Sequence, residues 1–321
     1  MRQFLIKMLA VFIVFYIALL LLQSYIDNRL QNSKNPFYYD WNLLMKGKIN
    51  APMIFKGNSR TEVHYDTQII EKNTGISSYN LGIAGTSLAI EQIRWKSYLA
   101  HNKSPKIVVQ NIDLYALSNK PIAYKNQYLP YYSDSVFFEE LKKIDTTVLY
   151  EKYIPMSKYR GSIALLSEEF GIARNTNKIT QKTKGYLKHS AKWNFNLANM
   201  KKSIQKNNNR FKTSEIEFQL QVLQNIIKDC RAINATLILV WAPQYYELSA
   251  IQEPTLHKIK NQIRQIALEN KNVLFWDFTK DYITKDKKYF YNSFHMNDVG
   301  VAIFCRQFSD SLNVFQKKSI P

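Results

Sequence analysis

The chain has 321 residues, which is enough for one large α/β domain or two smaller domains. Its 46% hydrophobic content, with nine Gly and nine Pro, excludes wholesale disorder and collagen-like repeats, and two cysteines are too few for a disulfide scaffold or a multi-cysteine zinc module. The net charge of +19 predicts attraction to a polyanion, but charge alone does not distinguish nucleic acid, anionic lipid and acidic surface glycans.

An apolar segment comes first, at residues 4–22, and Lys7 is its one charged residue. Nineteen residues are long enough to span a bilayer as a helix. Because no small-residue cleavage site follows, we expect residues 1–30 to be a cytoplasmic tip and an uncleaved transmembrane anchor. A cleaved signal peptide and a buried core helix are the alternatives.

The positive charges on the two sides of this anchor are nearly equal in number, so they do not determine its orientation in the membrane. Arg2 and Lys7 lie at its start, and Arg29 and Lys34 follow it. A soluble body needs an anchor mainly when it works outside the cell. We therefore expect a single-pass protein of the cell (inner) membrane with its body on the extracytoplasmic side, where nucleic acid is not a partner.

Short apolar runs alternate with longer amphipathic segments through the rest of the chain. Strands are expected at 51–55, 77–81, 106–110, 236–241 and 272–276. Helices are expected at 61–72, 88–101, 215–233 and 301–312. This alternation predicts an α/β domain over residues 31–321, with a mostly parallel sheet covered by helices on both faces.

Two regions break the alternation. Residues 115–133 are rich in Tyr, Pro and Asn, and we expect a long loop near the carboxyl end of the third strand, where open α/β sheets hold their ligands. Residues 171–214 carry eleven Lys and Arg and no acidic residue. This basic insertion is interpreted either as a solvated segment or as a clamp for an anionic polymer or lipid headgroups.

Three short motifs carry the chemistry. Gly57-Asn58-Ser59-Arg60 stands between a strand and a helix, where the hydroxyl of Ser59 lies at the sheet edge, although a serine there is also a common helix N-cap. A glycine-containing turn at 80–87 follows the second strand and can offer backbone N–H groups. His295, before the last helix, is a candidate base or a surface residue.

The three motifs in this order resemble the SGNH or GDSL-type serine hydrolases and acyltransferases, in particular their membrane-anchored, cell-surface branch. The resemblance covers about residues 51–315. It implies a flavodoxin-like three-layer α/β/α sandwich, with Ser59 as the nucleophile and His295 as the base. It also implies an oxyanion hole built from Ser59, Gly85 and Asn111.

The chain departs from the family pattern in two places. Where the family usually has Gly-x-Asn-Asp after the third strand, this chain has Gln110-Asn111-Ile112-Asp113, which leaves Asn111 as a candidate oxyanion donor only. Where the family usually has an Asp three residues before the base, this chain has Asn292. An amide oxygen can orient an imidazole, but it cannot stabilise the imidazolium by charge. Asn292 therefore joins Ser59 and His295 in the predicted catalytic set, while activity could be reduced or lost.

The remaining Cys and His residues predict no cofactor and no metal site. The other four histidines, His64, His101, His189 and His257, show no ligand spacing. Cys230 and Cys305 fall on separate predicted helices, where buried thiols are expected, although an extracytoplasmic location would permit a disulfide.

Two functions remain at this point. In the first, Ser59 attacks an acyl ester, typically acetyl, on a cell-surface polysaccharide or related acylated polymer. In the second, the fold binds an anionic surface polymer without turnover or serves as the partner of a membrane acyltransferase.

Overall fold

The computed structural model describes residues 1–118, 121–162, 166–167, 170, 182–194, 198–199, 202, 211–253 and 255–319. The chain forms two compact units, each built from separate stretches. Unit 1 comprises Met1–Lys48, Lys96–His101 and Tyr124–Thr180, and unit 2 comprises Ile49–Trp95, Asn102–Ala123 and Gln181–Pro321. These units do not test the predicted domain boundary near residue 31, which stays a prediction.

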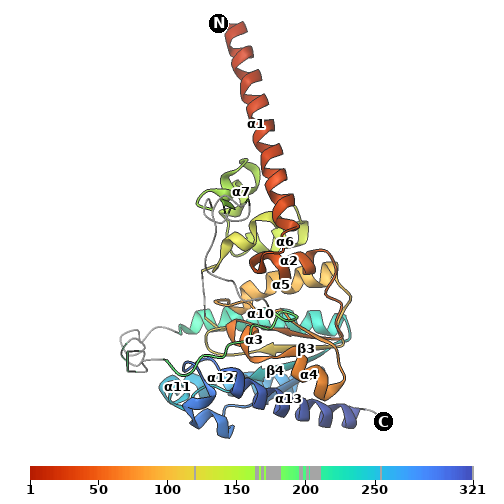
Figure 1. The fold of residues 1–321 in the computed structure, drawn as a ribbon, viewed down its shortest axis with the longest axis vertical. Helices are drawn as coiled ribbons and strands as arrows, with labels where there is room; N and C mark the ends of the chain where they lie inside the picture. Colours follow the sequence, from red (N-terminus) through yellow and green to blue (C-terminus); the bar gives the residue numbers. More distant parts are fainter. Residues whose placement is uncertain are drawn as a thin grey trace. The chain divides into compact units, whose positions relative to one another are not determined.

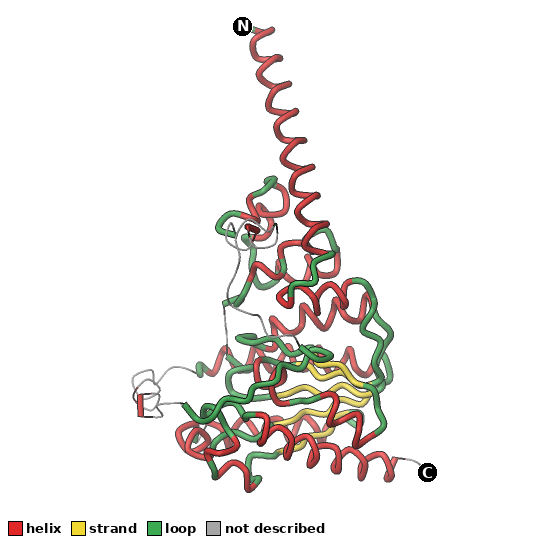
Figure 2. The backbone as a smooth tube through the Cα atoms, viewed as in Figure 1, coloured by secondary structure: helices red, strands yellow, loops and turns green. Residues whose placement is uncertain are grey.

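Unit 2 contains a five-stranded sheet in which every pair of neighbours is parallel (Figures 1 and 2). The strands are β1 (Met53–Lys56), β2 (Ser78–Asn80), β3 (Ile107–Asn111), β4 (Thr236–Trp241) and β5 (Val273–Asp277). Their order, β2-β1-β3-β4-β5, is the doubly wound order of flavodoxin-like folds. The α/β prediction and the position of each predicted strand are confirmed.

The central strands are buried along their length, because helices cover both faces of the sheet. Every residue of β1 and β3 is buried, and apolar side chains such as Phe55, Val109 and Ile238 form the core. Continuous burial of this kind is the pattern of parallel strands with two covered faces. The edge strand β5 is less buried.

The helices of unit 2 divide between the two faces. They are α3 (Ser59–His64), α4 (Thr67–Thr74), α5 (Leu88–His101), α10 (Thr213–Ala232), α11 (Tyr246–Gln252), α12 (Thr255–Glu269) and α13 (Asp298–Ser319). On one face α13 packs on α4, and on the other α10 is hydrogen-bonded to α5. Short 3-10 turns, Tyr282–Lys285 and Lys287–Tyr289, precede α13. Only residues 88–95 of α5 belong to unit 2, and its last turn belongs to unit 1.

The expected helix at 61–72 is wrong as a single helix, because it divides at Tyr65–Asp66. The Asp66 side chain accepts hydrogen bonds from the backbone N–H groups of Gln68 and Ile69, so it caps a new helix. Gly75 ends that helix in the left-handed conformation. The break gives α3 only six residues, directly after β1.

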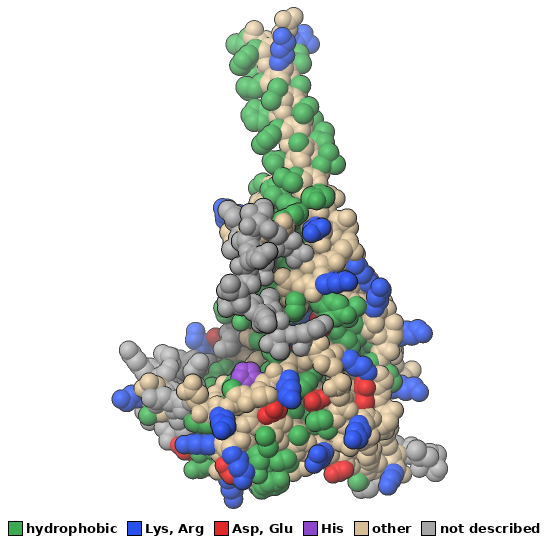
Figure 3. All heavy atoms as spheres, viewed as in Figure 1, with side chains coloured by type: hydrophobic (Ala, Val, Ile, Leu, Met, Phe, Trp, Pro, Cys, Tyr) green, Lys and Arg blue, Asp and Glu red, His purple; other side chains and the backbone are tan. Residues whose placement is uncertain are grey.

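Unit 1 is helical in its described residues. It contains α1 (Arg2–Gln31), α2 (Pro36–Met45), α6 (Ser135–Lys142) and α7 (Val148–Tyr153), with 3-10 turns at Lys125–Gln127, Leu129–Tyr131 and Ser157–Tyr159. The expected loop at 115–133 thus contains two of these turns, and its residues 119–120 lie outside the described part. Helix α1 is long and apolar enough to cross a membrane by length and composition, and apolar side chains cover its surface (Figure 3).

Candidate active site

The turn after β1 places Ser59 at the carboxyl edge of the sheet. Gly57 has φ +148°, and a Cβ there would lie 2.1 Å from the Thr61 Oγ1, so only glycine fits the turn. Asn58 is the N-cap of α3, because its Oδ1 accepts the Arg60 backbone N–H at 3.0 Å. The capping alternative for Ser59 is therefore wrong: Asn58 provides the cap, and the Ser59 hydroxyl points elsewhere.

The Ser59 hydroxyl contacts the predicted base, His295, which lies 236 positions later in the sequence. The Ser59 Oγ lies 2.8 Å from the His295 Nε2. Both residues belong to unit 2, and both side chains are half-buried. A serine hydroxyl in hydrogen-bond contact with an imidazole is the arrangement that nucleophilic catalysis requires. His295 lies in the loop between β5 and α13, as predicted, and it is not a surface residue.

Asn292 holds the other ring nitrogen of the base. Its Oδ1 lies 3.1 Å from the His295 Nδ1 and also accepts the backbone N–H groups of Phe294 and His295, each at 2.9 Å. One amide oxygen thus closes the turn and contacts the imidazole. Since an oxygen can only accept here, Nδ1 carries the proton and Nε2 is left to accept from Ser59.

The surroundings of His295 favour its neutral form. Burial, with the nearby positive charge of Arg60 and then His189, lowers the pKa of His295 to about 3. No carboxylate of the described residues contacts its ring to offset this. The imidazole is consequently unprotonated at neutral pH but is a weak base.

A second histidine, His64, supports the base from α3. Its Nε2 accepts the backbone N–H of Met296 at 3.0 Å, and its ring lies 5.9 Å from that of His295. It is fully buried, and burial together with Arg60 lowers its pKa well below the ordinary value. This role was not predicted from the sequence, because only the fold brings His64, at the end of a six-residue helix, to the loop at 292–296.

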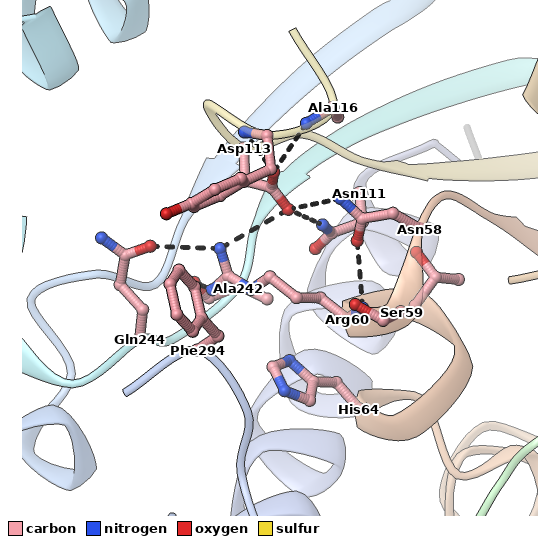
Figure 4. Close-up of polar contacts among 12 residues, drawn as sticks. Asn58, Ser59, Arg60, His64, Asn111, Asp113, Ala116, Ala242, Gln244 and Phe294 are labelled. Carbon is pink, nitrogen blue, oxygen red and sulfur yellow. Dashed lines mark hydrogen bonds and ion pairs between the residues drawn. The ribbon is translucent and has the colours of Figure 1, made fainter. Parts of the chain in front are cut away.

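Arg60 and Asp113 tie the ends of three strands together behind Ser59 (Figure 4). The Asp113 carboxylate accepts from the side chains of Asn58 and Asn111 and from the backbone N–H groups of Tyr115 and Ala116. Arg60 is 3.7 Å from the same carboxylate and donates to the carbonyls of Ala242 and Pro243 after β4. All these residues except the half-buried Tyr115 are buried, so they fix the loops that frame the site.

The residues predicted for the oxyanion hole lie at different depths. Asn111 is fully buried: its Nδ2 donates to Asp113 at 3.2 Å, and its Oδ1 accepts from the Tyr65 hydroxyl at 3.2 Å. Gly85 is exposed, with φ +74°. Among the described residues, no hydrogen bond joins Gly85 to Ser59, His295 or Asn111. The oxyanion roles stay predictions.

A different glycine of the 80–87 turn makes the close approach. A Cβ on Gly82 would lie 2.3 Å from the Glu62 backbone nitrogen, so Gly82 lets the loop after β2 pack directly on α3. The neighbouring Ile83 N–H donates to the Gly57 carbonyl at 3.0 Å. Close packing against the helix that begins with Ser59 therefore explains the glycine at position 82 of the turn.

Part of the basic insertion runs beside the site. Much of 171–214 lies outside the described residues, including Arg174, Lys178, Lys201, Lys206 and Arg210. The described residues 182–194 form a strap on unit 2, in which Lys182 pairs with Glu62 and Lys184 with Glu71, both at 2.7 Å. The ring of His189 stacks on Tyr291 at 3.8 Å, and Tyr291 stacks in turn on His295 at 5.4 Å. The strap therefore supports the loop that carries His295.

The two cysteines do not form a disulfide, although both belong to unit 2. Cys230 on α10 and Cys305 on α13 are buried free thiols, which confirms the first expectation for them. Within the part of the chain that the structure describes, no three His, Cys, Asp or Glu side chains form a group that could hold a metal ion.

No protein-family model matches the chain, and no curated protein sequence matches it. Among solved structures, a candidate acylhydrolase from Bacteroides fragilis aligns with 88% of this chain and 98% of its own, at 14% identity and a TM-score of 0.39. A family two carbohydrate esterase from Clostridium thermocellum, in complex with cellohexaose, aligns with 83% of this chain at 9% identity and a TM-score of 0.37. An active-site mutant of such an esterase aligns with 81% at a TM-score of 0.35.

The alignments span 64% and 62% of the two esterase chains, less than two thirds of their length. At these identities and TM-scores, nothing about the function of this chain follows from them.

Proposed function

We propose that the chain is a membrane-anchored serine esterase or O-acyltransferase of the SGNH type. The single observation that carries the proposal is the 2.8 Å contact between the Ser59 Oγ and the His295 Nε2, with Asn292 at the other ring nitrogen. The proposed substrate is an acyl ester, acetyl in the first instance, on a cell-surface polysaccharide or related polymer.

The reaction would proceed through an acyl-enzyme. The Ser59 Oγ attacks the acyl carbonyl carbon while its proton passes to the His295 Nε2. The protonated ring then gives that proton to the departing alcohol, and the carbon–oxygen bond of the ester breaks. Water or a second hydroxyl then attacks the acyl carbon and gives its own proton to Nε2. The bond between the acyl carbon and the Ser59 Oγ breaks, and Nε2 returns the proton to that oxygen, which frees Ser59. The backbone N–H groups of Ser59 and Gly85 are the proposed oxyanion donors.

Membrane anchoring is part of the proposal. Helix α1 would cross the cell membrane once and leave the body on the extracytoplasmic side. A reporter that works only outside the membrane, fused to the C-terminus of the full chain, should be active. Activity of a cytoplasm-dependent reporter alone would contradict this topology and, with it, the surface-polymer substrate.

A fluorophosphonate probe tests the nucleophile directly. The wild type should be labelled and Ser59→Ala should not, because the probe reacts only with an activated hydroxyl. Ser190→Ala is a matched control, since Ser190 is an exposed serine of the strap and bonds Asp298. Labelling that persists in Ser59→Ala with its fold intact would refute the assignment.

The alternative function is binding by a protein of the same fold that does not catalyse ester hydrolysis or transfer. The pKa of His295, lowered to about 3, and the amide in place of an acid both weaken the base. A protein with such a site could bind an anionic surface polymer or partner a membrane acyltransferase. Absence of probe labelling in the folded wild type, together with retention on the polymer, would favour this alternative.

A further inference from the structure

A segment of unit 1 that contains α7 lies beside the C-terminal half of α1 (Figure 1). Three contacts fix it, one at each of three levels along α1. The Tyr16 hydroxyl donates to the Tyr153 carbonyl at 2.9 Å, and the Met156 N–H donates to the Gln23 side chain at 2.7 Å. Lys158 pairs with Asp27 at 2.7 Å. The C-terminal end of α7 therefore lies level with Tyr16, and the residues after α7 run along α1 toward Asp27.

The side chains of α7 have an inside-out arrangement. The exposed ones are apolar or aromatic: Leu149, Tyr150 and Tyr153, joined by Ile154 just after the helix, are between 43% and 65% exposed. The charged ones turn inward, because Glu151 binds Lys125 and the Tyr132 hydroxyl. Lys152 lies 3.8 Å from the centroid of the Phe138 ring. A helix in water would have the opposite arrangement.

The depth along α1 indicates what covers these side chains. No charged residue stands between Lys7 and Asp27, and at 1.5 Å per residue this stretch is about 28 Å long, close to the hydrocarbon thickness of a bilayer. Tyr16 lies eleven residues before Asp27, about 16 Å into that stretch. The end of α7, at the same level, would then be inside the membrane.

We propose that Leu149, Tyr150, Tyr153 and Ile154 form a membrane lip, which dips into the leaflet on the C-terminal side of α1 and contacts lipid. The bond from Tyr16 satisfies a backbone carbonyl at a depth where water is scarce. The paired charges of Lys125, Asp145 and Glu151 face the protein, as charges near lipid do. This proposal rests on α1 spanning the membrane and not on esterase activity.

Depth-dependent quenching tests the lip in the full chain reconstituted into phosphatidylcholine nanodiscs. A solvent-sensitive fluorophore is attached to Tyr153→Cys, which keeps the backbone carbonyl that Tyr16 bonds, while the native cysteines are buried. Acyl chains that carry a nitroxide should quench the label, and its emission should shift to the blue. The same label on Tyr282→Cys, an exposed tyrosine of unit 2, should respond instead to aqueous iodide.

Two further positions make every outcome informative. Leu149→Cys repeats the measurement if Tyr153→Cys does not fold, and Phe12→Cys reports on α1 itself. If lipid nitroxides quench the label at position 12 while iodide quenches the labels at positions 149 and 153, the membrane lip is overturned. The membrane-spanning role of α1 would be retained. A label at 149 or 153 that neither quencher reaches would show that a second copy covers the lip, which also overturns the proposal. Lipid quenching at none of these positions would overturn both lip and anchor, while probe labelling of Ser59 would be unaffected.

Discussion

The His64 Nε2 accepts the backbone N–H of Met296 at 3.0 Å, so the helix that begins with Ser59 is bonded to the loop that carries His295. The bond requires a neutral His64 with its proton on Nδ1. Burial, which lowers the pKa of His64 well below its ordinary value, favours that form. His64 therefore acts as a positioning residue for the proposed base.

Loss of this bond should slow the chemical step. In His64→Ala the Met296 N–H is left unpaired in the interior, and we expect kcat for a small acetyl ester to fall about tenfold or more while KM changes little. His64→Gln, whose side-chain oxygen can accept the same bond, should recover much of the loss. His257→Gln, at an exposed histidine of α12, is the control for substitution itself. If His64→Gln were no better than His64→Ala, the hydrogen bond would not be what positions His295.

Asn292→Asp should strengthen the base. A carboxylate keeps both backbone bonds of the turn and adds a negative charge beside Nδ1, which stabilises the imidazolium formed during the reaction. We expect hydrolysis of a small ester to rise by at least about tenfold at pH 7. Asn292→Leu, which removes all three acceptor contacts, should lower it. An unchanged or lower rate in Asn292→Asp would mean that the amide is already suited to this site.

The pH profile should follow the lowered pKa of His295, about 3. The ring is in its active, unprotonated form above that value, so wild-type kcat/KM should show no acid limb near the ordinary histidine pKa of about 6.5. In Asn292→Asp the pKa rises, and an acid limb should appear at higher pH than in the wild type. A wild-type limb near 6.5 would mean that the site is more open to water than the structure shows.

Stability should depend on the same groups. His64 and His295 both have lowered pKa values in the folded state, so the unfolded chain binds more protons below about pH 6.5. The free energy of unfolding should therefore fall as the pH drops from 6.5 toward about 3. Urea midpoints at several pH values measure this slope, which should be smaller in His64→Gln than in the wild type.

The strap lysines give a test of the polymer clamp. Replacement of Lys182, Lys184, Lys188 and Lys192 by Gln should weaken retention on an anionic polymer and reduce its salt dependence if their charge contributes to binding. Lys182, Lys184 and Lys188 lie within 4 Å of the carboxylates of Glu62, Glu71 and Asp298. Lys192→Gln alone is the sharper variant, because no carboxylate of the described residues pairs with it. Retention equal to wild type in both variants would assign the strap a purely structural role.

Sequence patterns predicted the strands well, but they predicted only some of the contacts between residues that are distant in the sequence. Each strand was predictable because a buried parallel strand is a continuous apolar run. The pairing of Asn292 with His295 was predicted from the family resemblance, which places the residue that orients the base three positions before it. The cap at Asn58 and the break at Asp66 were missed, since Ser59 and Thr61 are equally good helix starts by residue type. His64 was missed because its partner, Met296, offers only a backbone N–H, which leaves no mark in the sequence.

The interleaving of the two units has a consequence for the order of events during synthesis. Helix α1 emerges before the rest of unit 1, but its partners in that unit, Tyr153 and Lys158, are translated more than a hundred residues later. By then β1, β2 and β3 have emerged, while β4 and β5 are still to come. Each unit therefore completes its fold only after part of the other unit has been translated. A pause in translation before β4 should leave both units incomplete and exposed to chaperones and proteases.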